Sequence, residues 1–296
     1  MAQEHVRVTV HDHLTPALHD QIVAFLDDAG AQGWRGLDDN LRGDLALAGG
    51  GPRLAVVATT DGGALRGYAQ ASDANDGLLV GCVVAEGERD LQVLLLRTVL
   101  DCLPHDCPVA WWSTDASADV ASLLGMVADR RLLKMGRPLP IDATTDAPVR
   151  PFRPGVDEVA WLEVNNAAFA WHGEQGGWDL QTLQQREREP WFDAAGFLLH
   201  ERDGRLAAFC WTKLHHGAGL VGEIYVIAVH PDFHGLGLGR ALTVAGLQHL
   251  QAVGASAAML YVDAGNDAAV GLYRDLGFDV LHTDQSYLRP PRGAEP

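Results

Sequence analysis

The pattern of apolar and polar positions repeats once along the 296-residue chain. Residues 53–70 consist of a short apolar run, an Asp61-Gly62 turn and a second run, and residues 196–213 repeat this pattern around Asp203-Gly204. An Asp-Gly pair between two apolar runs is a strong signal for a β-hairpin. We therefore expect one hairpin in each half of the chain.

The segments around the two hairpins correspond as well. Residues 6–10 indicate a strand and residues 18–29 an amphipathic helix, and residues 149–152 and 156–169 repeat this order. Each hairpin is followed by another apolar strand and then by a helix. The pattern predicts an α/β fold with two copies of one unit, each a mixed sheet with flanking helices.

A proline-rich stretch separates the two copies. Prolines at high density break helices and discourage central strands. Four of them, Pro138, Pro140, Pro148 and Pro151, fall within residues 137–153, and Pro154 follows directly. We place the boundary near residue 146, which predicts an N-terminal domain of residues 1–145 and a C-terminal domain of residues 146–296.

A glycine-rich segment in the second half predicts an anion site. Residues 223–229 indicate a strand that Pro231 ends, three alternating glycines follow, and the next residues have helical periodicity up to Gly254. Amides at a helix start point at one place, and the helix dipole adds roughly half a positive charge there. Arg240 occupies the position where a dinucleotide fingerprint needs glycine, and no P-loop lysine follows. A simple flexible turn is the alternative.

A second segment, residues 261–278, predicts another strand end and helix. Asn266 suits the helix N-cap, apolar residues recur at helical spacing, and Gly277 suits the stop. Phe278 can then pack back on the helix.

Together the two segments resemble the acetyl-coenzyme A signature of the Gcn5-related N-acetyltransferase (GNAT) family. The family's first motif, Arg/Gln-x-x-Gly-x-Gly/Ala, is met from His234 to Gly239. Its second motif, Asn-x-x-Ala-x-x-Leu-Tyr-x-x-x-Gly-Phe, is met from Asn266 to Phe278. His234 departs from the usual Arg or Gln, which weakens the side-chain part of pyrophosphate binding and leaves the backbone part.

The resemblance implies two tandem GNAT-like domains, each with a mixed, mostly antiparallel twisted sheet flanked by helices. It implies acetyl-CoA as co-substrate, in a cleft where strands 223–229 and 259–262 splay apart, with the Val229 amide polarising the thioester carbonyl. The residues it implies for acetyl-CoA are Ile227, Ala228, Val229, His234, Gly235, Leu236, Gly237, Leu238, Gly239, Arg240, Asn266, Asp267, Ala268, Ala269, Val270 and Gly271.

Two residues are candidates for proton transfer. An α-amine has a pKa near ~8, so a base need only remove a weakly held proton. Glu223 is the candidate base, because it starts the strand beside the thioester; a solvated strand-end carboxylate is the alternative. By the resemblance, Tyr273 lies near the cofactor sulfur and donates a proton to the departing thiolate; core packing is the alternative.

A narrower resemblance concerns the acceptor. Residues 164–178, Trp211-Thr-Lys213 and residues 222–226 resemble the mycothiol synthases, tandem acetyltransferases that acetylate the cysteinyl amine of the sugar–inositol Cys-GlcN-Ins. The likeness is strong from about residue 149 to 288 and faint before that. It implies acceptor contacts from Glu174, Lys213, Glu223 and Tyr261, and by analogy from Asp38 or Asp39. Charged groups suit a hydroxyl-rich ligand. The alternatives to acceptor contacts are that Glu174 is a solvated loop residue, that Lys213 extends from its strand into solvent, and that Asp38 is an acidic residue at a helix start.

The first half departs from the cofactor pattern. Its counterpart of the glycine loop, residues 84–96, has only Gly87, and the carboxylates of Glu86, Glu88 and Asp90 would repel a diphosphate. We place Leu124 at the position that corresponds to Tyr273. The first domain is therefore expected to be degenerate, to bind no acetyl-CoA productively, and to have a structural role in closing the acceptor cleft.

Composition limits the possible partners. A net charge of −17, from 39 acidic and 22 basic residues, disfavours nucleic acid. The longest apolar run, about residues 78–85, is too short for a bilayer, and the first ten residues lack a signal-peptide core, so we expect a cytoplasmic protein. The spacing of the four cysteines predicts neither a metal site nor disulfides, only free thiols. We expect a monomer that binds acetyl-CoA and Cys-GlcN-Ins.

Two other functions stay open at this point. One is a tandem acetyltransferase for a different amine, such as an aminoglycoside or a peptide N-terminus. The other is a non-catalytic module that senses acetyl-CoA. Trials of acceptors would separate these functions, because a sensing module would bind acetyl-CoA without turnover.

Overall fold

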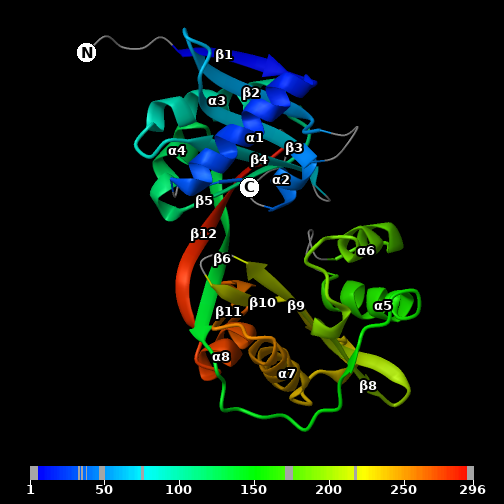
Figure 1. Cartoon of the computed structure of the whole chain (residues 1–296). Helices are drawn as coiled ribbons and strands as arrows, with labels where there is room; N and C mark the ends of the chain where they lie inside the picture. The colour runs from blue at the N-terminus through cyan, green and yellow to red at the C-terminus, as the bar shows by residue number, and fades with distance from the viewer. Residues whose placement is uncertain are drawn as a thin grey trace. The chain divides into compact units, whose positions relative to one another are not determined.

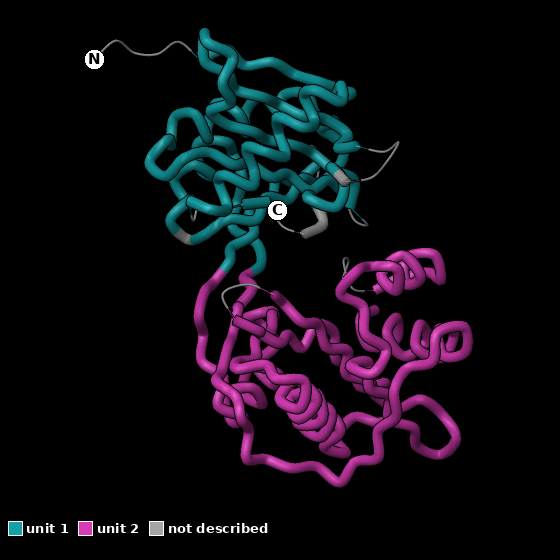
Figure 2. Tube along the Cα trace, viewed as in Figure 1, with its two compact units in different colours: residues 1–130, 284–296 teal, residues 131–283 magenta. Residues whose placement is uncertain are grey.

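The computed structural model describes residues 6–32, 34, 36–37, 39–46, 51–74, 77–170, 176–216 and 219–291. Contacts divide the chain into two units (Figure 2). Unit 1 comprises residues 1–130 and 284–296, and unit 2 comprises residues 131–283. Each unit is a layered α/β structure with helices on both faces of its sheet (Figure 1).

Unit 1 is built on the strand order β1-β2-β3-β4-β5, antiparallel except for the parallel β4–β5 pair. Its strands are β1 (Val6–His11), β2 (Leu54–Thr60), β3 (Leu65–Ala74), β4 (Gly77–Val84) and β5 (Val109–Ser113). Its helices are α1 (Pro16–Ala31), α2 (Asp39–Ala46), α3 (Arg89–Cys102), the 3-10 turn η1 (Asp115–Ser117) and α4 (Ala118–Leu123).

Unit 2 is built on the order β11-β10-β9-β8-β7, antiparallel except for the parallel β10–β11 pair. Its strands are β7 (Arg150–Pro151), β8 (Phe197–Arg202), β9 (Arg205–His216), β10 (Leu220–Val229) and β11 (Ala257–Asp263). Its helices are α5 (Glu158–Ala168), α6 (Leu180–Glu187), α7 (Leu238–Ala252) and α8 (Asp267–Asp275), with the 3-10 turns η2 (Ala194–Gly196) and η3 (Pro231–Phe233). This repeated, mostly antiparallel architecture confirms the predicted fold class.

Period-two alternation gives each sheet two buried faces. Along β2, Leu54 and Val56 pack with α3 and α4, whereas Ala55 and Val57 pack with α1 and α2. In unit 2, residues such as Phe209 on β9 pack with α5 and α6. Cys210 and its neighbours on that side pack with α7 and α8. A sheet buried on both faces explains why these strands are almost continuously apolar.

Both predicted hairpins are present, and both predicted helix ends in the second half are confirmed. In the β8–β9 turn, Asp203 and Gly204 have φ values of 53° and 75°, as a tight turn of this kind requires. At the end of α8, the Gly277 amide donates to Arg274 and the Phe278 amide donates to Tyr273. This pair of hydrogen bonds is the Schellman motif, which satisfies the last carbonyls of a helix.

The structure divides the chain differently from the expected boundary at residue 146. Two strands, β6 (Val127–Pro138) and β12 (Asp279–Arg289), have residues in both units. Residues 132–138 of β6 pair with β11, so unit 2 begins before the prolines. Residues 285–289 pair with β5, which returns the end of the chain to unit 1. The prolines interrupt secondary structure over residues 139–149, but strand pairing sets the division.

None of the helices in the described part of the chain is long and apolar enough to cross a bilayer.

Candidate active site

The parallel pair at the centre of unit 2 opens halfway along its length. Its register runs from Val221 opposite Ala257 to Ile224 opposite Leu260 and ends there, although β10 continues to Val229. On the other side, β10 stays paired with β9 as far as Val229. Beyond Ile224, the backbone of β10 on the side of β11 is therefore not part of the parallel β10–β11 ladder. This is the opening in which the sequence placed Ile227, Ala228 and Val229.

A β-bulge lies where the opening begins. The register of β10 against β9 shifts between Ile224 and Val226, which leaves Tyr225 as an extra residue. Tyr225 and Val226 both pack on the face covered by α5 and α6. Bulges re-aim side chains in this way. Here the bulge puts Val226 on the face that carries Glu223 and Tyr225, where regular alternation would have put it on the other face.

The glycine loop lies at the start of α7, where the sequence predicts an anion cradle. Gly235 and Gly237 have φ values of 77° and 74°, a left-handed conformation that favours glycine. Gly237 is the N-cap of α7 and provides no side-chain acceptor for the helix amides. The first amides of a helix have no partner within it. Leu236 and Arg240 are exposed beside them, while Leu238 is buried.

His234 contributes differently from the arginine or glutamine of the motif. Its Nε2 lies 3.0 Å from the carbonyl oxygen of Val229, to which it donates. The ring thus ties the loop to the end of β10. The prediction of an anion at this loop therefore depends on the backbone amides of residues 235–240.

The second cofactor segment opens α8. The Asn266 side chain accepts a hydrogen bond from the Ala269 amide at 3.2 Å, which confirms the predicted N-cap. Asp267, Ala268 and Ala269 form the first turn of the helix. The next residue, Val270, is buried, and Gly271 is exposed. These residues therefore form a second helix N-terminus in unit 2.

Tyr273 lies one turn further along α8 and is only 6% exposed. Its ring packs edge-on against Phe278, with ring centroids 5.9 Å apart. Burial, and to a smaller extent the nearby Cys210 thiol, raises the pKa of Tyr273 above its ordinary value. The phenol therefore stays protonated, which is the state a proton donor needs.

Glu223 is an interior residue of β10, not its first, because the strand begins at Leu220. It is 7% exposed, which excludes the alternative of a solvated strand-end carboxylate. Its register partner on β9 is Lys213. Its Oε2 atom lies 2.6 Å from Nε2 of His215. The carboxylate is thus buried and flanked by two basic side chains of β9.

Lys213 contacts two aromatic rings. Its Nζ lies 4.8 Å from the centroid of Trp191 and 5.5 Å from that of Tyr225. A cation over aromatic faces is attracted by the ring quadrupoles. This arrangement holds the ammonium group above the sheet face that carries Glu223.

Tyr261 lies on the same face of the sheet as Glu223. Met259 is the register partner of Glu223, and residues two apart on a strand share a face. Tyr261 is 44% exposed, and Nζ of Lys134 lies 5.6 Å from its ring centroid. Lys134 and Lys213 are the two lysines of the chain. The structure therefore places Glu223, Lys213 and Tyr261 on one sheet face, and Tyr273 in the core on the other face.

Asp38 and Glu174 lie outside the described residues. The segment after Glu174 is anchored: the Asn166 side chain accepts from the Trp178 amide at 3.0 Å and donates to its carbonyl at 2.8 Å. Trp178 is buried against Trp161. It is therefore a core residue.

Two functional candidates were missed by the sequence reasoning. His215 follows Lys213 by two residues, so strand periodicity alone would have put both side chains on one face. Trp191 reaches the lysine from the segment after α6, and nothing in the local sequence indicates that contact.

Unit 1 lacks the charged groups found at the corresponding positions. In the repeat, Gln70 corresponds to Lys213; it is fully buried and donates to the Leu41 carbonyl and to Ser72. A Cβ added to Gly81 on β4 would lie 2.4 Å from the Leu37 side chain, so apolar groups fill that face.

The counterpart assigned to Tyr273 needs correction. At the end of α4, the Met126 amide donates to Ala121, as the Phe278 amide donates to Tyr273 at the end of α8. The shared helix-end geometry makes Ala121 the structural counterpart, whereas Leu124 corresponds to the C-cap Leu276. Neither Ala121 nor Leu124 has a hydroxyl, so unit 1 has no equivalent proton donor at this position.

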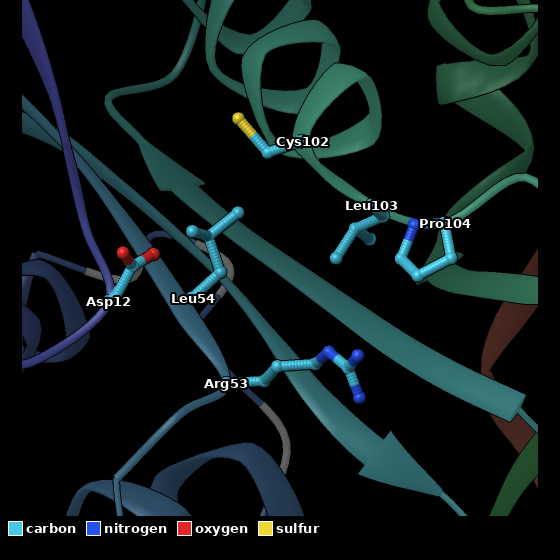
Figure 3. Close-up of a pocket in the computed structure, with 6 residues that line it drawn as sticks. All are labelled: Asp12, Arg53, Leu54, Cys102, Leu103 and Pro104. Carbon is cyan, nitrogen blue, oxygen red and sulfur yellow. The ribbon is translucent and has the colours of Figure 1, made fainter.

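A cavity of about 400 Å³ lies elsewhere, in unit 1 (Figure 3). Its lining residues are Asp12, Arg53, Leu54, Cys102, Leu103 and Pro104. The Arg53 guanidinium is already paired with Asp73 at 3.0 Å. None of the six belongs to the expected site.

Among the residues that the structure describes, no three or more His, Cys, Asp or Glu side chains group to hold a metal ion.

Comparison with known proteins agrees with this geometry. The sequence profile of the acetyltransferase (GNAT) family matches residues 161–278. A mycothiol acetyltransferase of Acidimicrobium ferrooxidans is 39% identical over 95% of this chain and 96% of its own length. The protein of the same name from Thermobispora bispora is 43% identical over 96% of this chain and 99% of its own.

Solved structures share the fold at lower identity. A GCN5-related N-acetyltransferase from Sphaerobacter thermophilus has a TM-score of 0.69 at 21% identity, covering 97% of both chains. A tandem GNAT protein from the clavulanic acid biosynthesis pathway has a TM-score of 0.66 at 14% identity, covering 98% of this chain and all (100%) of the other. Fold, motifs and relatives thus agree: the chain belongs to the mycothiol acetyltransferase family of GNAT enzymes.

Proposed function

We propose that this protein transfers the acetyl group of acetyl-CoA to the cysteinyl amine of Cys-GlcN-Ins, giving mycothiol and CoA. The observation that carries the proposal is the sheet face beside the β10–β11 opening. Buried Glu223, Lys213 and the exposed Tyr261 lie on that face. A base, a cation and a phenol suit an acceptor with an amine and many hydroxyls.

Acetyl-CoA binding is assigned to the opening and the two helix N-termini. The amides of residues 235–240 would hold the diphosphate, because partnerless helix amides attract anions. The β10 backbone from Ile227 to Val229 would hydrogen-bond the pantetheine arm. Residues 266–271 at the start of α8 complete the proposed binding surface.

The reaction then needs three proton transfers. Glu223 removes a proton from the acceptor ammonium, and the neutral nitrogen attacks the thioester carbonyl. The Val229 amide stabilises the oxyanion that forms. The C–S bond then breaks, CoA leaves as a thiolate, and the Tyr273 hydroxyl supplies its proton. The nitrogen, which became positively charged in the attack, loses its second proton, and this proton restores the Tyr273 hydroxyl. The products are the N-acetylated acceptor and CoA, with the first proton on Glu223.

The protonation state of the buried Cys210 thiol favours direct attack over an acetyl-enzyme intermediate. Burial raises the pKa of Cys210 to about 12. The thiolate is the nucleophilic form, so this side chain is inert at neutral pH. Its sulfur also lies within the packing of α7 on the sheet, 2.5 Å from where a Cβ on Gly246 would be.

Mass spectrometry of the reaction products tests the acceptor. Incubation of the full chain with acetyl-CoA and Cys-GlcN-Ins should give N-acetylated product, together with stoichiometric CoA release. Acetylation of only an aminoglycoside or a peptide N-terminus in the same assay would overturn the proposed acceptor. Acetyl-CoA binding without turnover on any amine would instead indicate a sensing module.

Glu223→Gln tests the proposed base in that assay. We expect kcat to fall at least about 100-fold, the usual contribution of a positioned base, while acetyl-CoA affinity stays unchanged. Glu163→Gln, at an exposed position on α5, is the matched control and should keep full activity. An unchanged kcat in Glu223→Gln would contradict the role of this carboxylate.

A further inference from the structure

The carboxylate of Glu223 is held by a neighbour on the adjacent strand. Oε2 of Glu223 lies 2.6 Å from Nε2 of His215. The Glu223 side chain is 9% exposed and the His215 side chain 35%. None of the roles assigned so far uses the imidazole.

The register explains why the two side chains meet. Glu223 is opposite Lys213, and His215 is two residues further along β9, opposite Val221. Residues two apart share a face, so His215 is the diagonal neighbour of Glu223. Diagonal neighbours are within reach of long side chains, which the short distance confirms here.

The chemistry of a base assigns the donor in this contact. A carboxylate that acts as a base is ionised and only accepts hydrogen bonds, so Nε2 of His215 is then the donor. A donor–acceptor distance of 2.6 Å is short for a nitrogen–oxygen pair and typical of a charge-assisted bond. Such a bond restricts the rotamer of the carboxylate.

We propose that His215 is a positioning residue for the reaction, which holds Oε2 of Glu223 so that Oε1 is presented to the acceptor amine. The proposal rests on the proposed function, because it gives the imidazole a role through the base. It predicts that His215 affects proton removal and leaves acetyl-CoA binding alone.

Other ionisable groups around the pair are accounted for. On the same sheet face lie Lys213 of β9, Tyr225 of β10 and Tyr261 of β11, with Lys134 against Tyr261. Helix α5, which packs on β9 and β10, carries the buried Glu158 and the exposed Glu163. Within the described residues, the imidazole of His215 is a hydrogen-bond partner of the Glu223 carboxylate.

Kinetics of three variants test the role. His215→Leu, which removes the donor, should lower kcat about tenfold with the KM for acetyl-CoA unchanged, since the hydrogen bond acts on the base and not on the cofactor. His215→Gln retains an N–H donor and should restore most of kcat. The matched control is His216→Leu, which changes the exposed neighbouring residue and should behave as wild type.

Three results would overturn the proposal. One is a kcat for His215→Leu within twofold of wild type. Another is an equal loss in His215→Leu and His215→Gln, which would show that the donor is not the cause. The third is a loss confined to melting temperature and acetyl-CoA affinity, which would indicate a structural role.

A spectroscopic measurement that needs no acceptor separates this proposal from the proposed function. The hydrogen on Nε2 of His215 is followed by nuclear magnetic resonance in wild type and in Glu223→Gln. We expect its signal to move upfield in Glu223→Gln, because the hydrogen bond to a charged acceptor is lost. The same chemical shift in both proteins would contradict the hydrogen bond, whatever the enzyme acetylates. A signal that moves as expected, with no acetylation of Cys-GlcN-Ins, would instead refute the proposed function.

Discussion

At the residue scale, burial decides what Tyr273 can do. Because burial raises its pKa, the Tyr273 hydroxyl stays protonated up to at least about pH 10. At that pH an α-amine is already neutral. Tyr273→Phe should lower kcat about 10- to 100-fold through loss of the proton for the thiolate, with little change in acetyl-CoA affinity. Steady-state kinetics measure both quantities.

Tyr287→Phe is the matched control for that substitution. Tyr287 is also buried, but its hydroxyl donates to the Thr114 carbonyl within unit 1. Its loss should reduce stability and leave kcat in place. An equal loss of kcat in both phenylalanine variants would argue against Tyr273 as the acid.

The same scale shows what a single sequence reveals about a site. Local chemistry made Glu223 and Asn266 predictable, and the structure shows a buried carboxylate and a working N-cap at these positions. His215 and Trp191 were not predicted, because their contacts depend on strand register and on a segment distant in sequence. The bulge at Tyr225 has no local signal either.

At the element scale, the start of α7 links backbone conformation to acetyl-CoA binding. Gly237 has a φ of 74°, whereas Gly239 lies within the helix. A Cβ on either glycine would meet no protein atom within 4 Å. The two positions therefore differ in backbone conformation rather than in available space.

Alanine at each of these glycines should give opposite results. Gly237→Ala should reduce the free energy of unfolding by about 1 kcal/mol, because a left-handed conformation is strained for alanine, and should weaken acetyl-CoA binding about tenfold as the amides move. Gly239→Ala should keep or raise stability, since alanine favours helices. Urea unfolding and calorimetry with acetyl-CoA measure these effects. Equal behaviour of both variants would contradict a backbone cradle at Gly237.

Element types were easier to predict than their organisation. Both Asp-Gly hairpins and the ends of α7 and α8 follow from short sequence signals, and they are confirmed. The division into units does not follow from such short signals, because β6 and β12 each begin in one unit and end in the other. Composition marks the proline-rich connection, but only long-range strand pairing reveals where the units divide.

At the scale of the whole molecule, the two units have kept the fold and diverged in chemistry. Unit 1 has a buried neutral network at Gln70 and an alanine at the counterpart of Tyr273. Its counterpart of the glycine loop has Glu88 as the N-cap of α3, paired with Arg66. We therefore propose that unit 1 is structural and that the acetyl group is presented in unit 2.

A crystal structure of the full chain with CoA and Cys-GlcN-Ins tests this account most directly. We predict CoA in unit 2, its diphosphate on the amides of residues 235–240, and the cysteinyl nitrogen within hydrogen-bond reach of Glu223. CoA found in unit 1 alone, or an acceptor nitrogen turned away from Glu223, would contradict the account.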